Sequence, residues 1–286
     1  KRRDVLTGLP SSLIGISTAA GVGSNPALAS NSNAYTNNGL AAKLSKREPA
    51  ALKNSVFNIP PAPQVFPEFL HGDWEVSLNF VGYLFPSQNI PKPQITNNLD
   101  IPGFQKCSIA SISDVGIDYK YKMRISPDTG LEDRCYNFQQ SINGALGYEA
   151  VEQVLYDPKS NPNRISIDFI KNRTRNANRI EIFCNGRECD LVPNPNDNAR
   201  DIFVNSEYAR QVTFSLGTEF GVARQVIGNY GQFWTWKEGP KSSETEMEKG
   251  VVQGNVLTAV YLDPQDPLFF KEPAKPVAVY SHNLSA

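Results

Sequence analysis

Aromatic side chains at alternating positions are the residues of this sequence that are best suited to bind a molecule. They are Tyr119, Tyr121, Tyr230, Phe233, Trp234 and Trp236. In a β-strand, residues two apart share one face of the sheet. On neighbouring strands these side chains would line an apolar cavity that also offers hydroxyl and indole hydrogen-bond donors. The pattern is compatible with a wall for an apolar ligand and with an interior that is mostly filled by side chains, and of the two we favour the filled interior.

Motifs for catalysis are weak. The sequence has neither a Gly-x-Ser-x-Gly elbow nor a phosphate-binding Gly-Lys-Ser/Thr loop, and its two histidines, His71 and His282, are far apart. The cysteines lack the Cys-x-x-Cys spacing that is typical of zinc sites. We therefore assign no catalytic residue, no metal site and no cofactor, and the sequence favours a binding protein over an enzyme.

The four cysteines predict disulfides. Cys184 and Cys189 enclose an Asn-Gly dipeptide, which favours a tight turn between two facing strands. Such a turn would bring the two sulfurs within bonding range, so we predict a Cys184–Cys189 bridge. Cys107 and Cys135 would then pair by elimination. An even number of cysteines is typical of an exported protein.

The first residues have the order of an export signal. Arg2 and Arg3 precede an uncharged stretch rich in Gly, Ala and Ser at 7–23, and Ala27 and Ala29 form a small-x-small cleavage pattern. The adjacent arginines resemble the twin-arginine signal, whose pathway delivers folded proteins in bacteria and into the thylakoid lumen. We expect residues 1–29 to be this signal.

Charge and hydropathy exclude two classes of partner. Lys and Arg total 28 against 29 Asp and Glu, so the chain has no basic excess with which to bind nucleic acid. After the signal, no segment approaches the roughly 18 consecutive apolar residues of a transmembrane helix. We expect no nucleic-acid partner and no membrane span in the mature chain.

Short alternating strands must position the aromatic residues. From Gly72, the side chains of Trp74, Val76 and Leu78 share one face. Similar runs, separated by Gly-rich and Pro-rich turns, predict about nine strands. They are expected at 72–86, 117–125, 132–142, 147–156, 164–170, 179–184, 208–216, 230–237 and 250–262.

This spacing indicates an all-β domain at 66–286, a single antiparallel up-and-down barrel of about 8–10 strands. Residues 30–65, which lack strand periodicity and end in a proline-rich run, are expected to be a flexible tether and lead-in.

The opening Gly72-Asp73-Trp74 resembles the first strand of lipocalin-like barrels, in which a Gly-x-Trp motif begins the strand and the Trp plugs one end. The chain is also similar to a group of lumenal proteins of plants, algae and cyanobacteria that carry such a domain behind a twin-arginine signal. The resemblance implies structural roles for Gly72 and Trp74 and an interior that takes an apolar ligand. Lipocalins usually place an Arg from the last strand on this Trp; the strand at 250–262 has none, and Arg210 is the nearest substitute.

The expected function is that of a non-catalytic protein of the thylakoid lumen that binds a pigment or lipid, or docks on a photosynthetic membrane complex as an accessory or assembly factor. One alternative is a lumenal enzyme that acts on a carotenoid or lipid. Another is a periplasmic or secreted binding barrel, which shares the fold and differs in its route.

Overall fold

The structure is a computed structural model that describes residues 39–54, 62–98, 100–104, 114–174, 177–194, 197–219, 222–239 and 251–286. The predicted signal, with Arg2, Arg3, Ala27 and Ala29, lies outside these residues, and so does Cys107.

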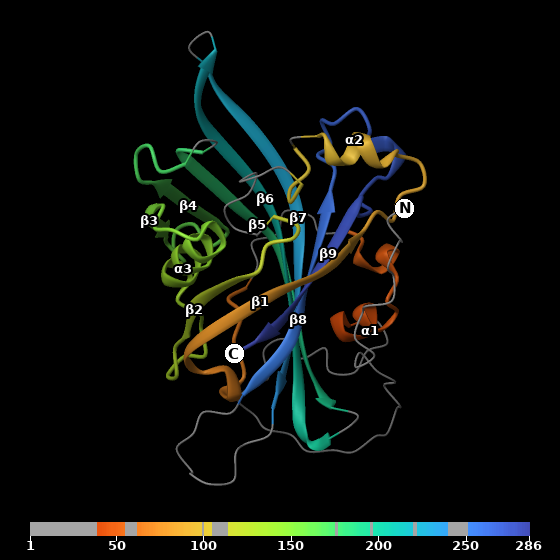
Figure 1. Cartoon of the computed structure of the whole chain (residues 1–286). Helices are drawn as coiled ribbons and strands as arrows, with labels where there is room; N and C mark the ends of the chain where they lie inside the picture. Colours follow the sequence, from red (N-terminus) through yellow and green to blue (C-terminus); the bar gives the residue numbers. More distant parts are fainter. Residues whose placement is uncertain are drawn as a thin grey trace.

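The described residues form one antiparallel sheet of nine strands, in the order β2-β1-β9-β8-β7-β6-β5-β4-β3 (Figure 1). The strands are β1 (Gly72–Leu84), β2 (Tyr119–Ile125), β3 (Val151–Tyr156), β4 (Arg164–Phe169), β5 (Arg179–Asn194), β6 (Asp197–Glu219), β7 (Val222–Glu238), β8 (Val252–Tyr261) and β9 (Ala278–Ser285). Each strand from β3 to β8 pairs with the next in the chain, and β1 pairs with β2 and β9. The predicted all-β fold class is confirmed.

The sheet is not closed into a barrel, which corrects the predicted closure. Within the described part of the chain, no hydrogen-bond ladder joins β2 to β3. Helix α3 (Arg134–Leu146) stands between these two edge strands (Figure 1). The chain leaves β2, forms this helix and enters β3, so the two edges of the sheet are consecutive in the sequence but separated in space.

Helix α3 occupies a segment in which a strand was predicted at 132–142. The side chain of Asp133 caps the helix by accepting a hydrogen bond from the Tyr136 backbone N–H at 3.1 Å. Gly147 ends it in the left-handed conformation, with φ of 77°. These two caps outweigh the weak alternation of apolar residues, so the helix forms.

Asparagine side chains of α3 satisfy the backbone of both edge strands. Asn137 accepts a hydrogen bond from the Arg124 backbone N–H at 2.7 Å and donates one to the Arg124 carbonyl at 3.1 Å. At the other edge, Asn143 Oδ1 accepts from the backbone N–H groups of Ala150 and Val151 at 2.9 and 3.0 Å. The helix thereby supplies part of the pairing that a tenth strand would give.

A glycine brings α3 close to β2. A Cβ atom at Gly144 would lie 2.3 Å from the backbone oxygen of Lys120. Only the absence of a side chain allows this approach, although Gly lowers helix propensity. The close contact fixes the height of the helix above the strand.

Part of the segment that was expected to be a tether packs on the sheet. Helix α1 (Leu40–Ser45) and the short 3₁₀ helix η2 (Pro49–Leu52) place Leu40, Leu44 and Leu52 in a buried cluster. Their partners include Tyr208, Phe233 and Tyr261 of the sheet. The Tyr261 hydroxyl donates a hydrogen bond to the Leu52 carbonyl at 2.6 Å. Residues 39–54 therefore cover one face of the sheet.

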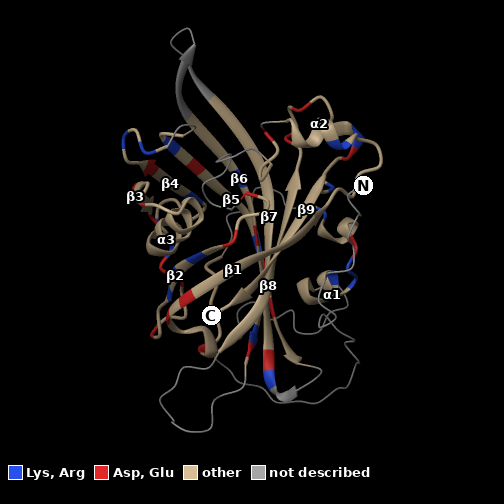
Figure 2. Cartoon of the chain, in the orientation of Figure 1, with Lys and Arg blue, Asp and Glu red and all other residues tan. Residues whose placement is uncertain are grey.

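Buried apolar residues also fill the other face, where they form two clusters. Phe66, Leu70, Trp74 and Val76 belong to the cluster under β1 and β2. A second, isoleucine-rich cluster lies under β4 and β5 and extends to residues of β7, β8 and β9. The middle of the sheet consequently carries few charged residues (Figure 2). The remaining short elements are η3 (Glu68–Leu70), α2 (Lys92–Thr96) and η4 (Phe269–Lys271).

Trp74 is a buried residue of the core. Its indole Nε1 donates a hydrogen bond to the Leu70 carbonyl at 2.8 Å, which joins β1 to the preceding 3₁₀ turn. Gly72 begins the strand with φ of 99°, a conformation that favours glycine. Arg210 lies elsewhere, with its Nε 3.4 Å from the Asp263 carboxylate.

The predicted Cys184–Cys189 disulfide is wrong. Both residues lie on β5, and the Asn-Gly dipeptide lies in a bulge at Asn185, between Cys184 and Gly186, instead of a hairpin turn. Five residues of extended strand span about 16 Å, whereas the Cα atoms of a disulfide lie about 4.4–6.8 Å apart. Cys184, Cys189 and Cys135 are free thiols.

None of the helices in the described ranges is both long and apolar enough to cross a membrane.

Candidate functional site

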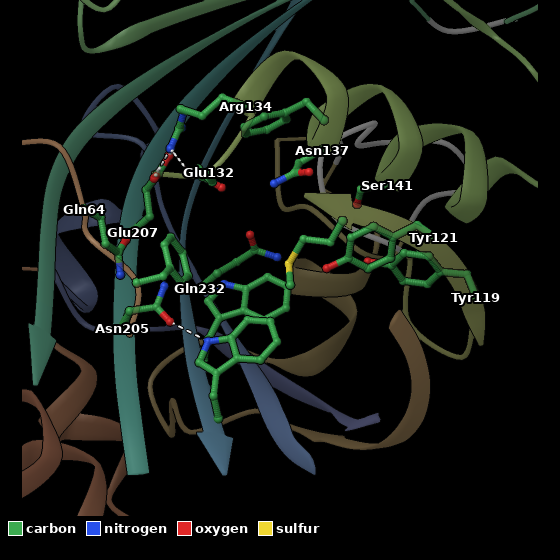
Figure 3. Close-up of a pocket in the computed structure, with 15 residues that line it drawn as sticks. Gln64, Tyr119, Tyr121, Glu132, Arg134, Asn137, Ser141, Asn205, Glu207 and Gln232 are labelled. Carbon is green, nitrogen blue, oxygen red and sulfur yellow. Dashed lines mark hydrogen bonds and ion pairs between the residues drawn. The ribbon is translucent and has the colours of Figure 1, made fainter. Parts of the chain in front are cut away.

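A pocket lies between α3 and β2 on one side and β6 and β7 on the other (Figure 3). It has a volume of about 100 Å³ and opens to solvent, so it is smaller than the ~300–1,000 Å³ of most small-molecule sites. The residues that precede η3 complete its wall through Gln64 and Phe66. The absence of a strand between β2 and β3 leaves room for this pocket, and α3 forms its roof.

Four of the six predicted aromatic residues line the pocket. Trp234 and Trp236 of β7 are stacked almost in parallel, with ring centroids 5.4 Å apart and an angle of 7° between the planes. Tyr119 and Tyr121 of β2 are stacked at 5.8 Å and 25°. Both pairs follow from the two-residue period of a strand, which places alternate side chains on one face.

The other two predicted aromatic residues lie outside the pocket. Phe233 alternates with Trp234 and points to the opposite face, where it is buried beneath α1. Tyr230 lies farther along β7 and packs in the isoleucine-rich cluster, with its hydroxyl 3.5 Å from Gln211 Oε1. Both side chains belong to the core.

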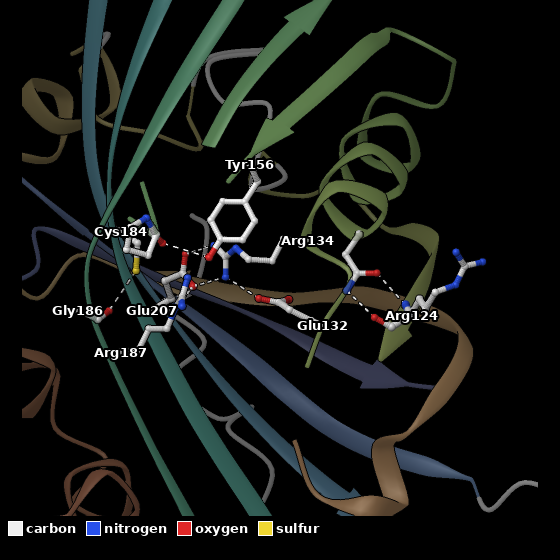
Figure 4. Close-up of polar contacts among 10 residues, drawn as sticks. Arg124, Glu132, Arg134, Tyr156, Cys184, Gly186, Arg187 and Glu207 are labelled. Atoms are coloured by element: carbon white, nitrogen blue, oxygen red, sulfur yellow. Dashed lines mark hydrogen bonds and ion pairs between the residues drawn. The ribbon is translucent and has the colours of Figure 1, made fainter. Parts of the chain in front are cut away.

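A buried group of charged residues forms one end of the pocket (Figure 4). Both oxygens of Glu207 on β6 accept hydrogen bonds from Arg134 of α3, at 2.7 and 3.0 Å. Arg187 of β5 donates to the same carboxylate at 2.8 Å. Glu132 accepts from Arg134 at 2.5 Å. These ion pairs connect α3 to the sheet across the gap between β2 and β3.

The charges of this group balance. Burial alone would raise the pKa of Glu207, but the guanidiniums of Arg134 and Arg187 hold the pKa well below its usual range. Burial opposes the charge of Arg134, but Glu207 and Glu132 overcome this effect and raise the pKa of the guanidinium. Two cations and two carboxylates are therefore present, with no net charge among them.

Aromatic rings and a thiol surround the charged group. The Arg134 guanidinium lies 5.3 Å from the ring centre of Phe138 and 5.4 Å from that of Tyr156, within cation–π range. Burial, together with the nearby Glu207, raises the pKa of the Cys184 thiol to about 12. This thiol stays protonated and is a poor nucleophile.

The two histidines lie away from the pocket wall. His71 Nε2 is 2.9 Å from the Phe66 carbonyl. His282 is buried 3.3 Å from the Ile117 carbonyl, and its burial lowers the pKa of the imidazole. In the described ranges, no group of three or more His, Cys, Asp and Glu residues is placed to hold a metal ion. The pocket thus offers apolar rings along its length and polar groups at one end.

Sequence reasoning missed the charged end of the pocket. Arg134 and Glu207 are 73 positions apart, and no local motif joins them. The caps at Asp133 and Gly147 were the available signal, because they would have identified the helix that carries Arg134.

Fold and site together define an all-β protein in which one antiparallel sheet, completed by a single helix, surrounds an aromatic pocket with a charge-balanced end. Residues 59–285 match the family described as Domain of unknown function (DUF6816), and the chain belongs to this family. No curated protein and no solved structure matches the chain.

Proposed function

We propose that the chain is a non-catalytic binding protein that holds an apolar small molecule, such as a pigment or lipid, in the pocket beneath α3. The observation that carries this proposal is the position of the stacked Trp234–Trp236 and Tyr119–Tyr121 pairs in the wall of one pocket. Tyr119, Tyr121 and Trp236 are at most 8% exposed, whereas Trp234 is half-buried and offers an apolar face to the pocket.

The export route belongs to the same proposal. The adjacent arginines and the small-x-small pattern of residues 1–29 support delivery to the thylakoid lumen, or to the periplasm if the chain is bacterial. The lipocalin-like resemblance supports the same binding role: the strands follow one another as in an up-and-down barrel, with a helix in place of the closing ladder.

Docking on a photosynthetic membrane complex receives less support. That role was expected from a free tether, which could lie along a partner surface. Leu40, Leu44 and Leu52 instead pack against the chain's own sheet, and this contact occupies residues 39–54. We therefore favour the pocket over the tether as the working part of the protein.

The experiment is purification from the native source, followed by mass spectrometry of bound small molecules. We expect an apolar compound to copurify with the wild-type chain and to be lost from Trp234→Ala, which removes one of the stacked rings. Phe270→Ala is the matched control, because Phe270 is 83% exposed and does not line the pocket. Repeated recovery of wild-type protein without any small molecule would contradict the proposal.

A further inference from the structure

The pocket has room for one ring. Its volume is about 100 Å³, and an apolar cavity of about 150 Å³ in another protein holds one benzene molecule. Because the pocket opens to solvent, any larger part of a ligand must lie outside its mouth. Among the four predicted aromatic residues in the wall, Trp234 is the half-buried one. A flat ring that enters the pocket can therefore stack on the indole of Trp234.

Acceptor atoms are the accessible part of the charged end. The side chains of Glu132 and Glu207 are 24% and 18% exposed, and both residues line the pocket. Those of Arg134 and Arg187 are only 5% and 7% exposed. A guanidinium has donors only, and an ionised carboxylate has acceptors only. The polar group of a ligand must consequently donate a hydrogen bond to be held at this end.

Glu132 is the carboxylate with spare acceptor capacity. A carboxylate offers about four lone-pair sites. Glu207 accepts two hydrogen bonds from Arg134 and one from Arg187. Within the part of the chain that the structure describes, Glu132 accepts one hydrogen bond, from Arg134 at 2.5 Å. The donor of a ligand is therefore best placed on Glu132.

One small ring reaches both features. Glu132 and Glu207 accept from the same Nη1 atom of Arg134, at 2.5 and 3.0 Å, so their carboxylates are neighbours. On β6, Glu207 lies opposite Gln232 of β7, which shares its face of the sheet with Trp234. Glu207 and Trp234 are thus diagonal neighbours, about 7–8 Å apart. Figure 3 shows Glu132, Glu207 and Gln232 around the same cavity.

The charge balance decides between a neutral donor and an ammonium group. The two arginines and the two glutamates of this end match each other. An added cation would leave an unpaired charge in a partly buried site, which is unfavourable. A hydroxyl donates a hydrogen bond without adding charge. A phenolic hydroxyl, whose pKa is near 10, stays neutral at pH 7 and joins the donor directly to a flat ring.

We propose that the pocket takes a single phenolic ring, stacked on Trp234, whose hydroxyl donates a hydrogen bond to the carboxylate of Glu132. This inference rests on the proposed binding function and adds the chemical class of the group that enters the pocket. The ring belongs to a small phenol, or it forms the end of a longer apolar molecule that leaves through the mouth.

The test compares four single-ring probes on the full chain. 4-Methylphenol carries the donor, toluene lacks it, 4-methylanisole has the same oxygen without its hydrogen, and 4-methylbenzylamine brings an ammonium group. Affinity is measured by NMR titration of the tryptophan indole N–H signals. We expect 4-methylphenol to bind at least about tenfold more tightly than each of the other three, the effect of one hydrogen bond to a charged group.

A fifth probe, 4-pentylphenol, separates the two sources of the ring. Tighter binding than that of 4-methylphenol identifies the ring as the end of a longer apolar molecule, because the added methylenes are removed from water at the mouth. Weaker binding identifies the ligand as a small phenol. Either result is consistent with the phenolic assignment.

The matched variants are Glu132→Gln and Glu152→Gln. Each replaces a carboxylate by an amide, but Glu152 is exposed on β3 and is not among the residues that line the pocket. Glu132→Gln should abolish most of the preference for 4-methylphenol over 4-methylanisole, whereas Glu152→Gln should retain it. Thermal melting checks that each variant folds. If Glu132→Gln does not fold, the ranking of the probes on the wild-type chain decides the proposal.

The outcomes separate the two proposals. Equal affinity for 4-methylphenol and toluene, or tightest binding of 4-methylanisole or the amine, overturns the phenolic assignment and leaves an apolar pocket in place. Failure of all the probes to bind the wild-type chain overturns the binding function itself, and the phenolic assignment with it.

Discussion

The side-chain amide of Asn137 pairs with the backbone of Arg124 in the way that a neighbouring strand would. It accepts from the N–H at 2.7 Å and donates to the carbonyl at 3.1 Å. An edge strand exposes such groups, and unpaired edges invite association with other chains. One residue of a helix thus protects the edge of β2 next to the pocket.

Replacement of Asn137 by Leu should destabilise the fold by about 1–3 kcal/mol, because the Arg124 backbone N–H loses its partner, whereas the Arg124 carbonyl still accepts from the Asp133 N–H at 3.1 Å. Urea denaturation followed by circular dichroism measures this difference. The control is Gln153→Leu on β3, whose amide bonds Asp168 at an exposed site and should cost less than about 1 kcal/mol. Equal effects of the two substitutions would show that the amide pairing of Asn137 is unimportant.

Gly144→Ala should destabilise the protein, although alanine is the better helix former by about 1 kcal/mol. The added methyl group would meet the Lys120 backbone oxygen at 2.3 Å, so helix and strand must separate. We expect a loss of at least about 2 kcal/mol, as for overpacked cores. Gly147→Ala is the control, because a Cβ atom at Gly147 would meet no other atom. Its only cost is the strain of a positive φ, which should destabilise the protein by about 1 kcal/mol. A stabilised Gly144→Ala protein would refute the close packing.

The strand pattern was largely readable from the sequence, because alternation is a local property. The stretch from Tyr119 to Ile125 alternates perfectly and forms β2. Whether the sheet closes into a barrel could not be predicted, because closure depends on whether the segment after Glu132 forms a strand or a helix. There the apolar spacing suggested a strand, and the caps at Asp133 and Gly147 produced a helix. The last strand, β9, was missed because prolines and a short apolar run surround it.

Acid should selectively reduce the contribution of Glu181 to the stability of the fold. Burial would raise the pKa of this carboxyl, but hydrogen bonds from Arg164, Ser166 and Arg179 lower it from the ordinary 4.5 to about 2. A depressed folded-state pKa gives stability that is present above the unfolded-state pKa and is lost as the pH falls towards the folded-state value. The free-energy difference between wild type and Glu181→Gln should therefore be largest above about pH 5 and shrink between about pH 4.5 and pH 2.

Urea midpoints at several pH values measure this trend. Glu152→Gln, at an exposed position on β3, serves as the control and should give a small, nearly constant difference. A Glu181→Gln difference that stays constant down to pH 2 would show that the carboxylate is not held by its three partners.

Thiol labelling should show two free cysteines on β5. Under denaturing, non-reducing conditions, Cys184 and Cys189 should both react, because they lie on one strand and cannot reach each other. In the folded protein, Cys184 should react far more slowly than in the unfolded chain, since it is buried and its pKa is raised to about 12. Peptide mass mapping after labelling distinguishes the sites. Recovery of the Cys184 and Cys189 peptides as a disulfide-linked pair would contradict this prediction.

The aromatic half of the site could be predicted, and its polar half could not. Trp234 and Trp236 stand two apart in a sequence that reads as a strand, so a shared face follows directly. The partnership of Arg134 with Glu207 depends on where α3 rests against β6, which is a tertiary contact. Phe233 was misplaced for a simpler reason: it directly precedes Trp234 in the strand, so its side chain must face away from both tryptophans.

The pairing of β1 with β9 sets how the molecule responds to mechanical force. Ser77 of β1 lies opposite Ser285, at the end of the chain, so the first strand and the last begin and finish at the same end of their shared ladder. A pull on the two strand ends would load the antiparallel hydrogen bonds one after another. The hydrogen bonds between β1 and β9 would then break one at a time, at low force. The gap between β2 and β3, where α3 packs, would carry none of the load.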